Sequence, residues 1–222
     1  MLLFLCLFYQ SPVDGNVERV YAGPTDFHFV KVCDRLSPVL GGTIMNLDFN
    51  AKRGFICDMD GVIYHGNRVL PGVAEFIQWL HDEEKEFLFL TNNSGYTPRE
   101  LQQKLARLGL DVSEDHFYTS ALATAAFLRE QAPGCSVFAI GEAGLLNALY
   151  DAGITMNDVN PDYVVVGEGR AYSLDTLTKA TNLVYNGAKL IGANSDVSGP
   201  VEGGIAPSCG ALVAPIELAT GK

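Results

Sequence analysis

The amino-acid sequence predicts an α/β protein with a parallel sheet, and three observations support this fold class. From Phe55 onward, short apolar runs alternate with helical patterns, which is the order typical of βαβ units. After Pro133 and Gly134 a second alternating series begins, which indicates a second domain. The 222 residues are 48% hydrophobic and 18% charged, so the chain can bury a core.

The first α/β domain is predicted over residues 47–133. Its elements are expected in the order strand 54–58, helix 73–80, strand 87–91, helix 98–108, strand 117–120 and helix 121–130. The helix at 98–108 is the best marked, because Thr97 and Glu100 fit a capping box and Gly109 ends the apolar pattern.

The second domain is predicted over residues 134–222. Its elements are expected in the order strand 136–140, helix 143–152, strand 162–166, helix 173–186, strand 189–192 and helix 211–220. Residues 198–204 are rich in glycine and proline, which predicts a loop. Pro215 fits either the first turn of a shorter last helix or a kink in a longer one.

Residues 1–46 show no period and are predicted to be an irregular extension. Because Met45 directly precedes the patterned region, one hypothesis is that the native chain starts there. The apolar run at residues 2–8 has no basic residue before it and is too short to span a bilayer, so we expect neither a signal peptide nor a membrane anchor.

The net charge of −11 disfavours a nucleic-acid or anionic-membrane partner, since both would be repelled. A phosphorylated small molecule is not excluded, because it needs only a local positive site. The five cysteines are odd in number and contain no C-x-x-C pair, so neither a disulfide framework nor a zinc site is predicted. A cytoplasmic location fits this composition best.

Two carboxylates, Asp58 and Asp60, follow the first predicted strand and are followed by Gly61. Residues two apart on an extended segment project to the same side, and ligands bind beyond the carboxyl ends of parallel strands. Two such close carboxylates repel each other, and a divalent cation would hold them together. The alternative is a solvated turn, but the buried strand before the pair and the glycine after it favour a site.

Polar side chains also follow two later strands. Thr91, Asn92 and Asn93 offer a hydroxyl, amides and backbone N–H groups that suit a phosphate oxygen, although such residues also form ordinary turns. Asn194 and Asp196 follow the strand at 189–192, where they either face a substrate or merely shape the turn.

Together these segments resemble the haloacid-dehalogenase (HAD) superfamily, subfamily IIA, which contains the NagD-type and 4-nitrophenyl-phosphatase-like proteins. The resemblance covers residues 53–222. It rests on the segments ICDMDGVIY at 56–64, LFLTNNS at 88–94, FYTSALATA at 117–125, DYVVVG at 162–167 and CGAL at 209–212.

The resemblance implies a Rossmann-like core, of which only the first half is present, followed by an α/β C2-type cap domain. It implies a hydrolase that cleaves small phosphorylated metabolites, such as nucleotides or sugar phosphates, through an aspartyl-phosphate on Asp58. Asp60 would be the acid and base, and Mg²⁺ would bind the Asp58 carboxylate and the Asp60 backbone carbonyl. The implied substrate-binding residues are Gly61, Thr91, Asn92, Asn93, Asn194 and Asp196.

The sequence departs from the family pattern at its end. The family returns to the core after the cap with a strand that carries a lysine and with a later acidic motif, and neither is present here. We therefore expect a bare side on the strand that carries Asp58. The alternative to an enzyme is a catalytically incomplete fragment, or a non-enzymatic remnant that binds a phosphorylated ligand or a partner. Whether the chain forms a homo-oligomer is left open.

Overall fold

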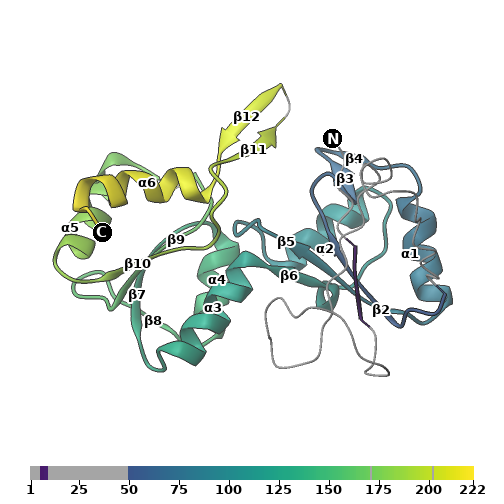
Figure 1. Cartoon of the computed structure of the whole chain (residues 1–222), viewed down its shortest axis with the longest axis horizontal. Coiled ribbons are helices and arrows are strands. Elements are labelled where there is room, and N and C mark those ends of the chain that lie inside the picture. The colour runs from purple at the N-terminus through teal and green to yellow at the C-terminus, as the bar shows by residue number, and fades with distance from the viewer. Residues whose placement is uncertain (1–5, 10–49, 171, 202) are drawn as a thin grey trace, which may run out of the picture. The chain divides into compact units, whose positions relative to one another are not determined.

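The computed structural model describes residues 6–9, 50–170, 172–201 and 203–222 (Figure 1). It confirms the predicted α/β fold class. By their contacts the residues form two compact units, one made of Met1–Leu90 and Leu105–Phe117, the other of Thr91–Lys104 and Tyr118–Lys222. The domain boundary that the sequence predicts near Gly134 stays a prediction. Among the helices of the described ranges, none has the length and apolar character needed to cross a membrane.

One four-stranded sheet has the strand order β1-β2-β5-β6. Its strands are β1 (Cys6–Tyr9), β2 (Gly54–Asp58), β5 (Glu86–Thr91) and β6 (Phe117–Thr119). β2 and β5 are parallel, and the register places Asp58 opposite Leu90. The three later strands of this sheet confirm the predicted strands.

The free side of β2 is not bare, so that expectation was wrong. β1 runs antiparallel to β2 there, with Cys6 opposite Cys57 and Tyr9 opposite Gly54. Residues 6–9 are therefore a strand, which also corrects the expectation that residues 1–46 are irregular throughout. The rest of that expectation, and the hypothesis of a start at Met45, concern residues outside the described ranges. β2 is therefore an interior strand of the sheet, and its backbone on this side is not available for pairing with another chain.

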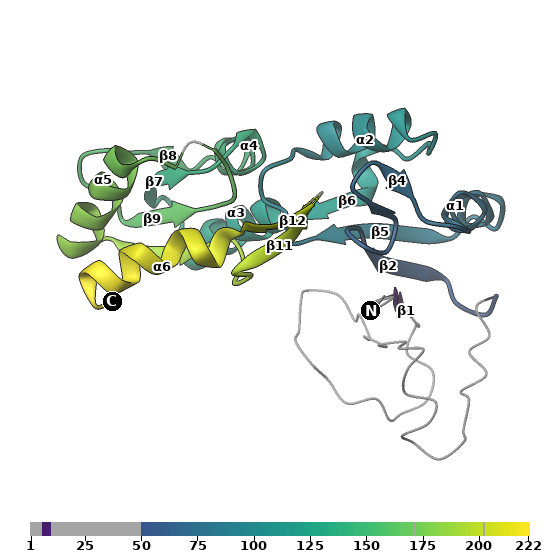
Figure 2. The same cartoon turned by 90° about the horizontal axis from the view of Figure 1, so that it is seen from above.

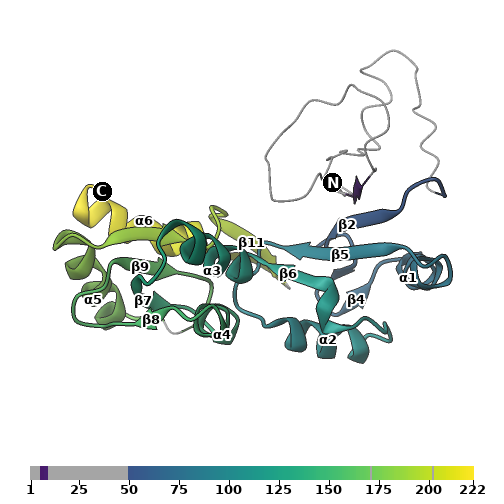
Figure 3. The same ribbon diagram turned by 90° about the horizontal axis from the view of Figure 1, so that it is seen from below.

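α1 (Val73–Asp82) lies beside the first sheet (Figure 3), and aromatic side chains pack it against β2. The Phe55 ring meets Phe76 and Trp79 edge to face, with centroid distances of 6.0 and 5.3 Å. Ile77 and Leu80 lie on the same apolar stripe and are buried. The spacing of these residues in the sequence thus fixes which face of the helix covers the sheet.

α2 (Pro98–Arg107) begins with the predicted capping box. The Glu100 N–H donates to Thr97 Oγ1 at 3.2 Å, and Glu100 Oε2 accepts from the Thr97 N–H at 2.8 Å. Of the predicted buried stripe of Leu101, Leu105 and Leu108, the first two are buried, whereas Leu108 follows the helix and is half-buried. Gly109 follows the helix with φ of +84°, a conformation that glycine adopts without strain.

The second unit contains a parallel sheet with the strand order β10-β9-β7-β8, of which Figure 2 labels β7, β8 and β9. Its elements are α3 (Ser120–Gln131), β7 (Ser136–Ile140), α4 (Ala143–Asp151), β8 (Thr155–Met156), β9 (Tyr163–Val166), α5 (Leu174–Tyr185) and β10 (Lys189–Gly192). All of these except the short β8 were predicted to within two residues.

Helices cover both faces of this second sheet. Val165 of β9 belongs to a core cluster with residues of α3 and α4, whereas its neighbours Val164 and Val166 belong to a cluster with residues of α5 and α6. Successive strand residues point to opposite faces, so the continuous Val-Val-Val run is explained by burial on both sides.

A hairpin stands where a loop was predicted at 198–204. β11 (Ser198–Val201) and β12 (Gly204–Pro207) pair antiparallel and project from the unit beside α6 (Figure 1). The prediction failed because proline and glycine were taken as loop formers, although both are tolerated in an isolated two-stranded hairpin whose outer edges are open. α6 (Cys209–Thr220) contains Pro215 in its interior, which decides for the longer helix. A further short hairpin joins β3 (Tyr64–His65) to β4 (Arg68–Val69), and a 3₁₀ turn spans Glu114–His116.

Candidate functional site

The first part of the candidate site is the carboxyl end of β2. Asp58 is half-buried, Met59 is fully buried and Asp60 is exposed, which is the alternation expected of an extended segment. The Met59 N–H donates to Asp58 Oδ1 at 2.7 Å. This bond fixes the rotation of the Asp58 carboxylate relative to the strand.

The chain turns sharply after this pair of carboxylates. The Gly61 N–H donates to the Tyr64 carbonyl at 2.8 Å, and the Met59 carbonyl accepts from the Ile63 N–H at 2.9 Å. Gly61 has φ of +79°, which only glycine adopts readily. Because Ile63 and Tyr64 are each 2% exposed, the turn is tied into the core of its unit. The two carboxylates are thus carried on a packed turn.

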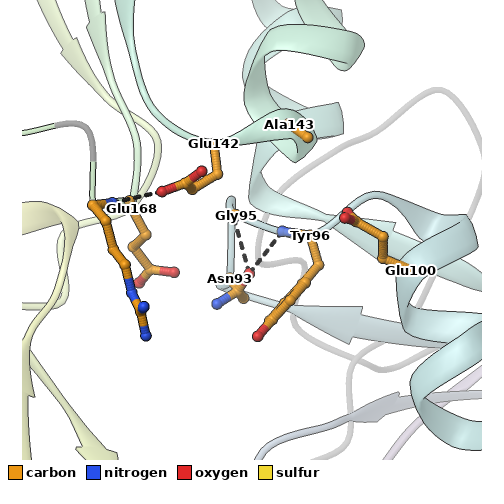
Figure 4. A pocket seen from close by; sticks show the side chains of 9 residues that line it. Asn93, Gly95, Tyr96, Glu100, Glu142, Ala143 and Glu168 are labelled. Atoms are coloured by element: carbon orange, nitrogen blue, oxygen red, sulfur yellow. Dashed lines mark hydrogen bonds between the residues drawn. The ribbon is translucent and has the colours of Figure 1, made fainter.

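A second group of candidate residues lies in the second unit, in the segment 91–94 at the end of β5, which we call the β5 loop. It begins one residue after Leu90, the register partner of Asp58. Thr91 is 5% exposed, and its Oγ1 accepts from the Asn93 N–H at 3.1 Å. Asn93 Oδ1 accepts in turn from the N–H groups of Gly95 and Tyr96, at 2.9 and 3.1 Å (Figure 4). The side chains of Thr91 and Asn93 therefore shape the loop itself.

Asn194 and Asp196 both contact Asn92 of the β5 loop, within the second unit. Asn194 Nδ2 donates to the Asn92 carbonyl at 2.7 Å, and Asn92 Nδ2 donates to Asp196 Oδ2 at 2.8 Å. Asn194 Oδ1 also accepts from the Asp196 N–H at 3.0 Å, which is an Asx-type turn. The structure thus shows both residues shaping their turn and holding the β5 loop.

An open pocket of about 400 Å³ lies beside the β5 loop (Figure 4). Its lining includes three carboxylates and one guanidinium, from Glu100, Glu142, Glu168 and Arg170. The carboxylates are already used by the protein: Glu142 Oε1, for example, accepts from the Arg170 N–H at 2.6 Å. Their excess negative charge makes the pocket a poor place for a phosphate.

The residues at the end of β2 fit a magnesium ion of the kind that also binds substrate. Among the residues that the structure describes, no group of three or more His, Cys, Asp or Glu side chains could hold a metal. Mg²⁺ is commonly bound through only one or two carboxylates, with waters and substrate phosphates as further ligands. The hard oxygen donors of Asp58 and Asp60 meet that requirement.

Two of the buried cysteines, Cys135 and Cys209, are not alternative nucleophiles. Burial raises the pKa of the Cys209 thiol, and its Sγ donates to the Val166 carbonyl at 3.1 Å. Burial likewise raises the pKa of Cys135. A thiol with a raised pKa is a weak nucleophile, so both cysteines are packing residues.

Comparison with known proteins agrees with the fold. The model of the haloacid dehalogenase-like hydrolase family matches residues 55–155. The chain is 45% identical over 170 residues to the ribonucleotide monophosphatase NagD of Escherichia coli K12, covering 77% of this chain and 66% of that protein. It is 44% identical over 167 residues to a dihydroxyacetone phosphatase of Corynebacterium glutamicum, covering 75% and 61%.

Solved structures of related proteins also match the fold of this chain. The structure of E. coli NagD matches with a TM-score of 0.69 at 45% identity, covering 75% of this chain and 65% of that one. A glycerol phosphate phosphatase of Mycobacterium tuberculosis in complex with magnesium matches with a TM-score of 0.69 at 31% identity, covering 75% and 51%.

The fold and these matches define a protein of the haloacid-dehalogenase type, with an α/β fold. The chain belongs to the haloacid-dehalogenase-like hydrolases, in the NagD-type branch, as its motifs predicted. It spans less than two thirds of the length of the E. coli and C. glutamicum relatives.

Three residues that the sequence analysis did not single out also hold the β5 loop. Ser120 Oγ donates to the Asn92 carbonyl at 2.7 Å. Glu168 binds Ser94, the last residue of the loop, and Ser208 donates to Glu168. The motif FYTSALATA contains Ser120, but no local pattern marks Glu168 or Ser208.

Proposed function

We propose that the chain carries the nucleophile and the cap of a magnesium-dependent phosphomonoesterase that acts on small phosphorylated metabolites, such as nucleotides or sugar phosphates. The observation that supports this most directly is the pair Asp58 and Asp60 on a packed turn at the carboxyl end of a parallel strand. Relatives named as a ribonucleotide monophosphatase and a dihydroxyacetone phosphatase support the substrate class.

In the proposed reaction, an Asp58 carboxylate oxygen attacks the phosphorus of the substrate. The bond from phosphorus to the leaving oxygen breaks, and Asp60 gives that oxygen a proton. A water molecule then attacks the aspartyl-phosphate, Asp60 takes a proton from the water, and inorganic phosphate leaves with Asp58 regenerated. Asp60 is exposed at the turn, which suits a group that exchanges protons with substrate and water.

Mg²⁺ bound by the Asp58 carboxylate and the Asp60 carbonyl would offset the negative charge shared by nucleophile and substrate. The solved magnesium complex of the M. tuberculosis relative supports this choice of ion. In the same proposal Gly61, the Thr91 hydroxyl, the Asn92 N–H and Asn93 receive the phosphoryl oxygens, while Asn194 and Asp196 lie toward the substrate. The reaction is assigned to the cytoplasm on the composition of the chain.

The test is hydrolysis of 4-nitrophenyl phosphate by the purified chain with Mg²⁺, compared with an EDTA control and with Asp58→Asn. Asn at position 58 can still accept from the Met59 N–H, so the turn should persist while the nucleophile is lost. Asp82→Asn is the matched control, because Asp82 is exposed and its carboxylate accepts from the side chain of Gln78. Hydrolysis that Asp58→Asn and EDTA abolish and Asp82→Asn preserves supports the proposal.

Folded protein that binds inorganic phosphate without hydrolysing the ester would instead favour a non-catalytic phospholigand-binding protein. Circular dichroism spectra of all variants establish that each is folded before activity is compared.

A further inference from the structure

Glu168 contacts three segments that lie far apart in the sequence, all within the second unit. Its N–H donates to Ser94 Oγ at 2.7 Å, and its Oε2 accepts from the Ser94 N–H at 3.4 Å. Its Oε1 accepts from Ser208 Oγ and, at 3.4 Å, from Asn194 Nδ2. A single half-buried carboxylate thus collects donors from the β5 loop, from the loop after β10 and from the start of α6.

The far end of the β5 loop is closely confined. Ser94 is 0% exposed, and both its N–H and its hydroxyl bond to Glu168. A Cβ on Gly167 would lie 2.8 Å from Ser94 Oγ, and a Cβ on Gly144 would lie 2.6 Å from the carbonyl oxygens of Ser94 and Tyr96. Only glycine at 144 and 167 allows the loop to lie this close to α4 and to the end of β9, so these two elements set the position of the loop.

The near end of the loop is joined to the same carboxylate through Asn194. Asn194 Nδ2 is 2.7 Å from the Asn92 carbonyl and 3.4 Å from Glu168 Oε1. The Asn194 side-chain amide thus donates to two acceptors, the Asn92 carbonyl and the Glu168 carboxylate, which together fix its orientation. Glu168 therefore acts on Ser94 directly and on Asn92 through one intermediate side chain.

We propose that Glu168 is a positioning residue that holds the β5 loop in the conformation that binds phosphate. This inference rests on the proposed function, because it takes the β5 loop as the phosphate-binding loop. Glu168 itself does not bind the phosphate: its two oxygens are acceptors, and a phosphate would be repelled by them. What it contributes is a fixed position for Asn92 and Asn93, of which the Asn92 N–H and the Asn93 side chain are proposed to bind the phosphoryl oxygens.

The substitution Glu168→Gln tests the role of the carboxylate with little change in size. One acceptor oxygen becomes an NH₂ group, which then faces a donor. Ser208 can rotate its hydroxyl to accept, but the Ser94 N–H can only donate, so the bond to Ser94 is lost or the side chain turns away from Asn194. Glu142→Gln is the matched control, because Glu142 lines the same pocket and its carboxylate bonds the Arg170 N–H.

The experiment measures the dissociation constant of inorganic phosphate by calorimetry for the full chain and both variants, with melting temperatures and amide NMR shifts of residues 92–95. We expect Glu168→Gln to weaken phosphate binding by about tenfold or more, which corresponds to one lost charge-assisted hydrogen bond. The NMR shifts of residues 92–95 should move, the variant should remain folded at the temperature of the binding assay, and Glu142→Gln should bind phosphate normally. Where the chain turns over 4-nitrophenyl phosphate, KM should rise more than kcat falls.

The proposal is overturned if Glu168→Gln binds phosphate as tightly as Glu142→Gln does. It is also overturned if Glu168→Gln and Ser208→Ala lose phosphate binding only in proportion to the fraction of each protein that is unfolded. Ser208→Ala removes only one of the donors to Glu168. Wild-type chain that binds no phosphate at all refutes both this inference and the proposed function. Phosphate binding that is normal in wild type and weakened only in Glu168→Gln, with no ester hydrolysis, supports the positioning role and refutes the enzyme.

Discussion

Replacing Gly144 by alanine should destabilise the second unit and loosen the β5 loop. Gly144 lies in the first turn of α4, and its N–H donates to the Gly95 carbonyl at 2.9 Å. An added Cβ would lie 2.6 Å from the carbonyl oxygens of Ser94 and Tyr96. Because both neighbours are backbone atoms, no side-chain rotation can relieve the overlap, and either the helix or the loop must shift.

The size of the effect follows from three contributions. Overpacking of this kind costs about 1–3 kcal/mol, and loss of the bond to the Gly95 carbonyl adds about 1 kcal/mol. Alanine is favoured over glycine in a helix by about 1 kcal/mol, which offsets part of this. We therefore expect a loss of about 1–3 kcal/mol in the free energy of unfolding, which lowers Tm by about 2–4 °C for each kcal/mol in a protein of this size.

The assay combines urea unfolding followed by circular dichroism with hydrogen exchange of peptides that cover residues 91–104. Trp79 is the one tryptophan of the sequence and lies in the first unit, so its fluorescence reports on that unit separately. Gly204→Ala is the control, because a Cβ there meets nothing within 4 Å. If Gly144→Ala unfolds at the same urea concentration as Gly204→Ala, and its loop amides exchange no faster, the close approach does not constrain the loop.

Three further substitutions or deletions test the rest of the fold. Leu149→Ala, at a fully buried residue of α4, should lower the free energy of unfolding by about 2–5 kcal/mol, measured by urea unfolding beside the half-exposed control Leu146→Ala. Hydrogen bonds from the Ser136 N–H and hydroxyl hold the pKa of Asp162 below its ordinary value of 3.8. The stability that this carboxylate contributes is therefore present above pH 3.8 and lost as the pH falls below it, so acid unfolding curves of Asp162→Asn should be less steep there than those of the wild type. Deleting residues 1–9 should expose the edge of β2 and promote self-association in analytical ultracentrifugation; a variant that stays monomeric would show that β1 does not protect this edge.

Elements with a strong local pattern could be predicted from the sequence. The capping box at Thr97 and the stripe of Leu101 and Leu105 predict α2 from residues that are close together in the sequence. The structure confirms each of these features. The run Val164, Val165 and Val166 likewise marks a strand that is buried on both faces.

The elements that were missed depend on pairing between segments. β1 exists as a strand through its partner β2, at a separation of about fifty residues, and its own four residues carry no alternating pattern. The β11–β12 hairpin is built from glycine, proline and small residues, whose intrinsic preference is for turns. In both cases backbone pairing overrides local propensity, and sequence pattern alone contains no trace of it.

The candidate site likewise has features that the sequence predicts and features that depend on contacts between distant segments. Polar residues at the carboxyl ends of β2, β5 and β10 could be singled out from the sequence, because ligands bind beyond the carboxyl ends of parallel strands. The sequence left open whether Asn194 and Asp196 face a substrate or shape a turn. The structure shows a further role, since both hold Asn92 through hydrogen bonds that span more than a hundred residues of sequence.

This further role changes how substitutions in the cap should be interpreted. Asn194→Ala would remove a donor from the Asn92 carbonyl and also a donor from Glu168, so it would disturb the β5 loop without any contact to substrate. A loss of phosphate binding in such a variant would therefore not by itself assign Asn194 to the substrate. An effect that differs between inorganic phosphate and a phosphate ester would do so, because the β5 loop is proposed to bind only the phosphoryl group that the two ligands share.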